Sequence, residues 1–279
     1  MREIDTKILS DYVCDGFIEI NHALSDDMVK SLHRAKENET SHVGKEVLCE
    51  ICENLEIAKN EMIPICQDTG MAVIFLEVGQ DVHFSGNLND ALNEGVRRAY
   101  AEGYLRCSVV GDPILRKNTG DNTPAIVHTS IVPGDCVTLT LCAKGFGSEN
   151  KSRIFMLSPA DGIEGIKKAV ITAVKDAGAS ACPPMVIGVG IGGDFEKCAL
   201  MSKAALTRDI SHPSSLPHIA ALEKELSEEI NALNIGPAGL SGDVTALAVN
   251  IETYPTHIAG LPVAVNICCH VCRHKTVII

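Results

Sequence analysis

Segments with helical periodicity and segments rich in β-forming residues follow one another along this 279-residue chain without a regular strand–helix–strand alternation. In the first 60 residues, apolar side chains recur at helical spacing, for example at Ile4, Ile8 and Tyr12. The run 71–78 is the first that suits a buried strand, because it is short and rich in β-forming residues. This irregular order favours an α+β fold with a helical N-terminal region, mixed helices and short sheets over a doubly wound parallel sheet.

The rest of the chain continues the mixture, which fits one large domain over residues 1–279 or two smaller lobes. Any boundary between lobes is expected near residues 150–160. Further helices are expected at 43–58, 87–104, 161–177, 196–206 and 216–233. Further strands are expected at 125–132, 135–143, 185–191, 245–251, 261–267 and 276–279.

Charge and hydropathy exclude several classes of partner. The formal net charge of −12 repels a phosphate backbone, which argues against a nucleic acid or an anionic membrane. The N-terminus has no apolar signal-peptide core, and no stretch approaches the roughly 18 to 20 apolar residues that span a bilayer. We therefore expect a soluble, cytoplasmic protein. A mean hydropathy of +0.14 suggests apolar surface that a partner subunit covers.

The twelve cysteines are expected to be reduced thiols, most of them small core residues and a few of them metal ligands. Cys49-x-x-Cys52 and Cys269-x-x-Cys272 each resemble half of a zinc site. The first pair lies in a helical pattern, where apolar packing explains it. The sequence therefore does not favour a structural zinc site.

A glycine-rich segment suggests a nucleotide site on first inspection. Gly188 to Gly193 matches the pattern G-x-G-x-x-G after a predicted strand and before a predicted helix. A dinucleotide site also needs an acidic residue at the end of a second strand about 20 residues further on. The nearest candidate, Asp209, lies in a segment without a strand pattern. We expect a packed turn or a small-anion site here, and NAD binding would test the nucleotide alternative.

Four segments combine polar, cationic and glycine residues within apolar surroundings, and with the C-terminal cysteines they carry the chemistry. Their motifs are Cys66-Gln-Asp-Thr-Gly70, Asn118-Thr-Gly-Asp-Asn122-x-Pro-Ala, Lys144-Gly-x-Gly-Ser-x-Asn-Lys151, Cys182-Pro-Pro and Val265-Asn-Ile-x-Cys-His270. With these motifs the chain resembles, from about residue 10 to residue 279, the alpha subunit of two-subunit class I fumarate hydratases. These are iron–sulfur hydro-lyases, and the L(+)-tartrate dehydratases are their relatives.

The resemblance implies a 4Fe-4S cluster held by three cysteines, and the positions that match are Cys66, Cys182 and Cys269. Cys268 and Cys272 compete for the third position, and Cys269 is preferred because the family pattern ends in Cys-His. Three thiolates on four irons leave one iron with an open position, as a Lewis acid requires. In the family this iron binds the substrate hydroxyl while a general base removes a proton from the adjacent carbon.

The resemblance also places Gln67, Asp68, Arg106 and Gly147 in contact with the substrate. A guanidinium such as that of Arg106 suits a carboxylate because it donates two parallel hydrogen bonds. Asp68 is the expected proton donor or hydroxyl-orienting residue, and an Asp before Thr-Gly is otherwise a turn former.

Three further residues each have a functional interpretation and a non-functional alternative. Lys144 and Lys151 are expected to bind substrate, or else to be solvated loop cations. His257 is expected to be catalytic together with Asp68, or else to be an ordinary loop histidine.

The resemblance implies an activity and a partner. The expected reaction is the reversible hydration of fumarate to L-malate, a step of the tricarboxylic acid cycle, and the alternative is the dehydration of L(+)-tartrate to oxaloacetate. Further arginines, a lysine and a threonine base are expected on a separate beta subunit, so that the active form is a hetero-oligomer. The alternative outside the enzymes is an iron–sulfur sensor protein without turnover. Substrate-induced changes in the cluster spectrum would distinguish the enzyme from the sensor.

Overall fold

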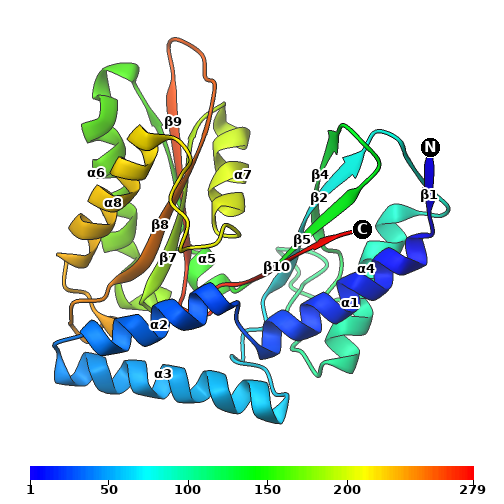
Figure 1. Cartoon of the computed structure of the whole chain (residues 1–279), viewed down its shortest axis with the longest axis horizontal. Helices are drawn as coiled ribbons and strands as arrows, with labels where there is room; N and C mark the ends of the chain where they lie inside the picture. Colours follow the sequence, from blue (N-terminus) through cyan, green and yellow to red (C-terminus); the bar gives the residue numbers. More distant parts are fainter. The chain divides into compact units, whose positions relative to one another are not determined.

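The computed structural model describes residues 1–279 and confirms the α+β fold (Figure 1). The chain forms two compact units, each with its own sheet and apolar core. Unit 1 contains Met1–Ser25, Asn54–Phe146 and Arg273–Ile279. Unit 2 contains Asp26–Glu53 and Gly147–Cys272.

Unit 1 is built on a four-stranded sheet with the strand order β10-β5-β2-β4. β2 and β4 are parallel, whereas β5 is antiparallel to both β2 and β10. β1 and β3 form a separate parallel pair. The strands are β1 (Arg2–Ile4), β2 (Met71–Gly79), β3 (Val82–Phe84), β4 (Ile126–Val132), β5 (Val137–Lys144) and β10 (Arg273–Ile278).

Helices α1 (Thr6–His22) and α4 (Leu88–Glu102) pack on the sheet of unit 1 (Figure 1). Each begins after a capping side chain, Asp5 for α1 and Asn87 for α4, which accepts a hydrogen bond from a backbone N–H of the first turn. Phe17 of α1 and Leu141 of β5 are fully buried in the shared core. Burial of a side chain of this size contributes roughly 1.5 to 3 kcal/mol.

Unit 2 is built on a second four-stranded sheet with the order β6-β9-β7-β8. Helices α6 and α8 cover one face and α7 covers the other (Figure 1). The strands are β6 (Arg153–Leu157), β7 (Met185–Gly192), β8 (Ala246–Tyr254) and β9 (Leu261–Cys268). The helices are α2 (Asp26–Asn38), α6 (Gly162–Ala177), α7 (Phe195–Ala205) and α8 (Pro217–Asn231), while α3 (His42–Glu61) and the short α5 (Phe146–Glu149) have residues in both units.

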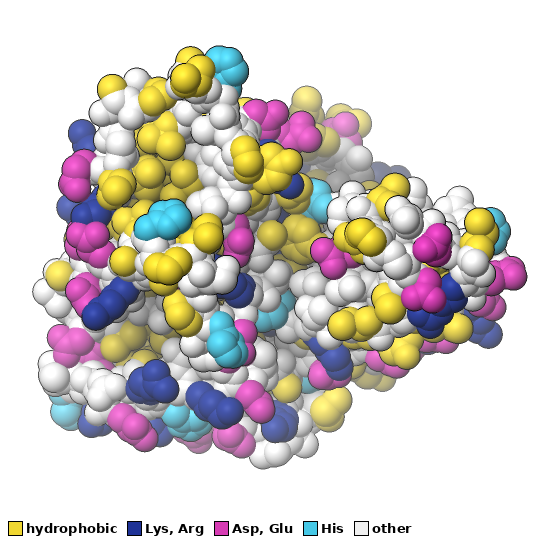
Figure 2. Space-filling model, turned by 45° about the horizontal axis from the view of Figure 1, so that its top comes forward, with side chains coloured by type: hydrophobic (Ala, Val, Ile, Leu, Met, Phe, Trp, Pro, Cys, Tyr) yellow, Lys and Arg dark blue, Asp and Glu magenta, His cyan; other side chains and the backbone are white.

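Large apolar side chains are exposed at the end of unit 2 where β8 turns into β9. Ile258 is 92% exposed, Phe195 63% and Tyr254 54%. The hydroxyl of Thr256 donates to the carbonyl of Gly193, which holds the turn against the start of α7. Figure 2 shows apolar side chains among charged ones on the face that includes this end. This end of unit 2 therefore exposes several large apolar side chains.

The glycines of the G-x-G-x-x-G segment are explained by the contact between β7 and α7. A Cβ on Gly188 would lie 2.0 Å from the carbonyl oxygen of Ser202, and one on Gly190 would lie 2.1 Å from that of Cys198. Only glycine lets the helix backbone approach the strand so closely. The segment is thus a close helix–strand contact, as the packing interpretation predicts.

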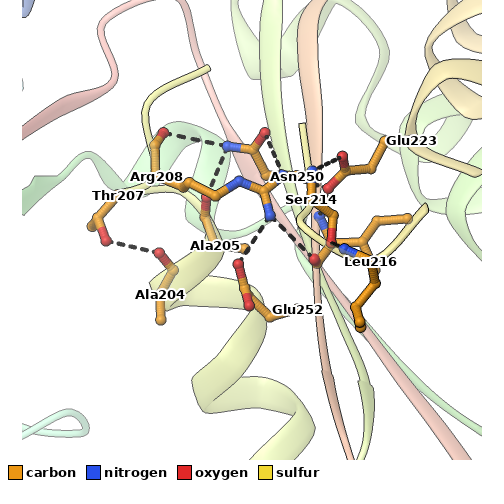
Figure 3. Close-up of polar contacts among 10 residues, drawn as sticks. Ala204, Ala205, Thr207, Arg208, Ser214, Leu216, Glu223, Asn250 and Glu252 are labelled. Carbon is orange, nitrogen blue, oxygen red and sulfur yellow. Dashed lines mark hydrogen bonds and ion pairs between the residues drawn. The ribbon is translucent and has the colours of Figure 1, made fainter. Parts of the chain in front are cut away.

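A buried polar network fixes the connection between α7 and α8 (Figure 3). The Arg208 guanidinium donates to the carboxylates of Glu223 and Glu252, and to the side-chain oxygen of Asn250 at 3.2 Å. Glu223, only 6% exposed, also accepts from the backbone N–H of Ser214 at 2.8 Å. Removing one partner of a buried ion pair costs about 3 to 5 kcal/mol, so this network holds the connection against β8.

Most predicted elements are present, and the differences concern short strands and the four-residue helix α5, which was not predicted. The helical N-terminal region is confirmed, and Cys49 and Cys52 both lie in α3. Cys52 is buried as the packing interpretation predicts, but Cys49 is exposed, so for Cys49 that interpretation is wrong. Ile4 was assigned to a helix but lies in β1. Neither β3 nor β6 was predicted. None of the helices has both the length and the apolar character needed to cross a membrane.

Candidate functional site

The segment that carries Cys66 is joined to the segment that carries Arg106 by hydrogen bonds within unit 1. The Thr69 hydroxyl oxygen accepts from the Arg106 backbone N–H at 3.0 Å and lies 3.2 Å from the Arg106 carbonyl. The buried Tyr100 hydroxyl lies 3.0 Å from the Thr69 carbonyl and 2.7 Å from that of Gly70. Burial raises the pKa of Tyr100, so its proton stays available for this bridge.

Asn122 ties the Asn-Thr-Gly-Asp-Asn motif to the same place. Its side-chain oxygen accepts from the backbone N–H groups of Ser108 and Val109 at 2.7 and 3.1 Å, and its amide donates to the Gly70 carbonyl at 3.2 Å. The side chain is fully buried. Two motifs far apart in the sequence therefore form one rigid structure that presents Gln67 and Arg106, both exposed.

Asp68 is held in a fixed orientation by backbone donors. One carboxylate oxygen accepts from the Gly70 N–H at 3.0 Å, and the other accepts from the Phe146 N–H at 2.8 Å. The first of these bonds is a turn-forming contact, which is the structural role predicted as the alternative for Asp68. The second links the Cys66 segment to the beginning of the Lys144–Lys151 motif, so Asp68 joins two of the predicted site segments.

Lys144 is buried, which is not expected of a solvated loop cation. It is the last residue of β5, its side chain is 1% exposed, and its Nζ donates to the Gly145 carbonyl at 3.1 Å. A buried ammonium needs acceptors or anions around it. The interpretation of Lys144 as a solvated loop cation is therefore wrong.

In unit 2 the fold brings Cys182 and Cys269 to the same end of the sheet. Cys182 lies three residues before β7, and Cys269 directly follows β9, whose last residue Cys268 pairs with Val186. The His270 ring Nδ1 lies 3.0 Å from the Cys182 carbonyl oxygen. Cys182 has the left-handed backbone conformation, φ 52° and ψ 62°, which costs roughly 1 to 2 kcal/mol outside glycine.

Burial separates the three competitors for the third ligand position. Cys268 is 3% exposed within β9, and Cys272 is 1% exposed with its Sγ donating to the Leu206 carbonyl at 3.4 Å. Cys269 is only partly buried. A cluster ligand must reach a group outside the core, and Cys269 is the least buried of the three; its role as a ligand stays a prediction.

Gly147, Lys151 and His257 also belong to unit 2. A Cβ on Gly147 would meet no atom within 4 Å, so there is open space beside it. Lys151 is partly buried, and its backbone N–H donates to the Ser148 carbonyl. His257 is exposed in the β8–β9 turn, whereas Cys269 follows the other end of β9. At about 3.3 Å per residue the strand separates them by roughly 25 Å, so unit 2 does not bring His257 to its cysteines.

The donor set suits an iron–sulfur cluster at the predicted positions. Cys182 is exposed and Cys66 and Cys269 are partly exposed, as ligands of an external group must be. Burial, followed by the charge of Glu102, raises the pKa of Cys14 to about 11, which opposes the thiolate that metals require. The predicted ligands are divided between unit 1 and unit 2, and the structure forms no group of three His, Cys, Asp or Glu side chains placed around one metal ion.

Thr69, Tyr100, Asn122 and His270 support the site but were not assigned roles from the sequence. Asn122 and His270 belong to two of the sequence motifs named above, so their positions in those motifs could have indicated a role. Tyr100 had no signal of its own, because it occupies an apolar position of a helical pattern.

Comparisons with known proteins identify the family of the chain. The model of the family described as fumarate hydratase (Fumerase) matches residues 10–278. A protein of Methanocaldococcus jannaschii, named provisionally as L(+)-tartrate dehydratase subunit alpha, is 40% identical over 94% of this chain and 94% of its own length. The L(+)-tartrate dehydratase subunit alpha of Escherichia coli K12 is 32% identical over 97% of this chain and 90% of its own length.

Proposed function

The chain belongs to the fumarate hydratase family of hydro-lyases, and on this premise we propose that it is the cluster-binding alpha subunit of a fumarate hydratase that interconverts fumarate and L-malate. The observation that carries the proposal is the pairing of the Cys182 and Cys269 segments at one end of the unit 2 sheet. A family member that brings the segments of an exposed and a partly exposed motif cysteine to one end of a sheet has two of the ligands that this chemistry needs.

Cys66, Cys182 and Cys269 would hold a 4Fe-4S cluster. When bound, the cluster supplies a Lewis-acid iron with an open position that favours departure of the substrate hydroxyl. The chain's own residues must then fix the dicarboxylate and handle the proton.

Arg106 and Gln67 are the proposed carboxylate-binding groups. Both side chains are exposed, and Thr69 holds the backbone of Arg106, so binding does not have to order that backbone. The guanidinium can donate two parallel hydrogen bonds to one carboxylate. Lys144, the last residue of β5, and Lys151 are proposed to add positive charge, and Gly147 leaves space for the substrate.

Asp68 is the proposed hydroxyl-orienting residue. Its carboxylate already accepts two backbone hydrogen bonds, and further lone pairs remain for a substrate hydroxyl. A carboxylate fixed in this way acts by orientation, because it cannot swing to follow the substrate. The base that removes the carbon-bound proton would come from a beta subunit. The word alpha in the relatives' names implies that such a partner exists.

His257 is proposed to serve the active site of a second copy in the assembly. Its separation from Cys182 and Cys269 along β9 rules out a direct role beside those two residues of the same unit. The exposed apolar side chains around the β8–β9 turn suit contact with another chain.

L(+)-tartrate dehydration is the second candidate activity, and the names of the relatives favour it. Tartrate differs from malate by a second hydroxyl, so both substrates use the same carboxylate and hydroxyl contacts.

The test is anaerobic co-purification of the chain with its beta subunit, followed by iron and sulfide analysis and turnover of malate and of tartrate. We expect about four irons and four sulfides per alpha chain, and faster turnover of malate. Zinc, or no inorganic sulfide, in anaerobic material would overturn the proposal. Faster turnover of tartrate would select the second candidate and leave the cluster in place.

A further inference from the structure

The end of the unit 2 sheet presents two cysteine-bearing segments that the strand ladder does not itself join. The ladder between β7 and β9 ends with the pair Val186 and Cys268. Cys182 lies four residues before that pair, and Cys269 lies one residue after it. The relative position of the two cysteines therefore depends on contacts made beyond the last paired residues.

His270 provides such a contact in two ways. Its backbone N–H approaches the Cys182 carbonyl oxygen at 3.4 Å, and its ring Nδ1 lies 3.0 Å from the same oxygen. A carbonyl oxygen can only accept, so Nδ1 carries the hydrogen and donates. Since His270 directly follows Cys269, one short segment holds one cysteine and clamps the backbone of the other.

The clamped carbonyl belongs to a residue that needs support. Cys182 has φ 52°, a left-handed conformation that a residue other than glycine adopts only when its surroundings hold it there. Its backbone N–H donates to the Ala179 carbonyl at 3.1 Å, and the next carbonyl, that of Pro183, accepts from Ala238 at 2.8 Å. The His270 ring thus completes a set of bonds on both sides of this residue.

We infer that His270 is a positioning residue for the iron–sulfur cluster, because its Nδ1–H fixes the Cys182 backbone so that the Cys182 and Cys269 thiolates face one cluster. The inference rests on the proposed function, which makes these cysteines ligands. His270 does not itself bind iron or substrate in this role. Its effect is on how firmly the cluster is held, and groups that orient metal ligands typically change metal affinity about 10- to 100-fold.

The experiment compares His270→Asn with His270→Gln in the full chain, purified anaerobically with its beta subunit. The two amides are chemically matched, but the Asn NH₂ can take the place of Nδ1, whereas the Gln NH₂ lies about one bond further out. His270→Ala removes the donor, and His212→Ala, whose side chain is 75% exposed, is the matched control in unit 2. The readouts are iron and sulfide per chain and the rate at which air produces the electron paramagnetic resonance signal of a three-iron cluster.

We expect His270→Ala and His270→Gln to lose iron about 10-fold faster than the wild type, and His270→Asn and His212→Ala to behave like the wild type. Equal rates in all variants would overturn the inference and leave the proposed function intact. So would equal losses in the Asn and Gln variants, because the ring would then act only by its bulk. A wild-type protein that holds no cluster would instead defeat the proposed function. If the Ala variant does not fold, the comparison of His270→Asn with His270→Gln still tests whether the Nδ1–H position is what matters.

Discussion

Asn122 is the side chain on which the unit 1 part of the site most depends. It hydrogen-bonds three backbone groups while fully buried, and its φ of 59° lies in the left-handed region that Asn tolerates better than Ala. We expect Asn122→Ala to lower the free energy of unfolding by about 2 to 4 kcal/mol, because buried donors and acceptors lose their partners. Urea unfolding measures this change.

Asn234 provides the matched control for Asn122. It also has a left-handed backbone, with φ 53°, but its side chain is on the surface and donates only to a nearby carbonyl at 3.3 Å. We expect Asn234→Ala to cost less than about 1 kcal/mol. Equal costs at the two positions would show that backbone strain, not the buried hydrogen bonds, accounts for the effect.

Single residues show where sequence reasoning reached its limit. The choice of Cys269 over Cys268 followed from the family pattern, and only the end of β9 gives it a physical reason, because Cys268 is buried in the strand. The burial of Lys144 could not be predicted, since a lysine among glycines and polar residues has the composition of a surface loop. Burial depends on tertiary contacts, which residue type alone does not determine.

At the scale of elements, the close contact between β7 and α7 predicts that a side chain at Gly188 destabilises the protein. Gly188→Ala would place a Cβ 2.0 Å from a helix carbonyl oxygen, so the helix must move away from the strand. We expect the free energy of unfolding to fall by about 2 to 4 kcal/mol, as for other overpacked positions. Gly147→Ala, with no atom within 4 Å of the added Cβ, should leave stability within about 0.5 kcal/mol of the wild type.

The stability that the contact between α4 and the 111–124 loop contributes should fall in acid. Burial alone would raise the pKa of Asp121, but hydrogen bonds from the Thr123 backbone N–H and hydroxyl and from Arg97 lower it to about 2. A carboxyl group whose pKa is depressed on folding stabilises the protein above its ordinary pKa near 4. That contribution is lost as the pH falls from about 4 toward 2.

Asp121→Asn tests this dependence. We expect the wild type to be more stable than the variant at pH 5, and the difference to shrink as the pH is lowered to 3. Urea unfolding at pH 5, 4 and 3 measures it. A difference that stays constant over this range would mean that shape or neutral hydrogen bonds, and not the charge of Asp121, hold the loop on Arg97.

Long elements could be predicted from periodicity, and short ones could not. α1, α3, α6 and α8 each repeat an apolar spacing over at least 15 residues, which is enough to reveal a helix. β1 and β3 have three residues each, too few to show alternation, and they form only because they pair with each other across 80 residues of sequence. Strand pairing of this kind depends on the whole fold and leaves no local signal.

At the scale of the whole molecule, the chain passes repeatedly between two units, so that residues remote in sequence share one sheet. β10, at the C-terminus, pairs with β5 in unit 1, although β9 before it belongs to unit 2. The sequence predicts a strand at residues 276–279. The structure confirms the strand: β10 lies at the edge of the unit 1 sheet, Ile278 is 69% exposed, and Ile279, directly after the strand, packs against the unit 1 core.

The proposed role of His257 in a second copy can be tested by mixing two inactive chains. Cys182→Ala lacks a cluster ligand, and His257→Ala lacks the histidine, so each alone should be nearly inactive with the beta subunit. If the histidine acts in another copy, a pair that contains one chain of each kind has one complete site and one doubly defective site. Co-refolding equal amounts, with random pairing, should therefore restore about a quarter of wild-type turnover. No recovery, with mixed assemblies shown by mass spectrometry, would mean that His257 acts within its own chain or not at all.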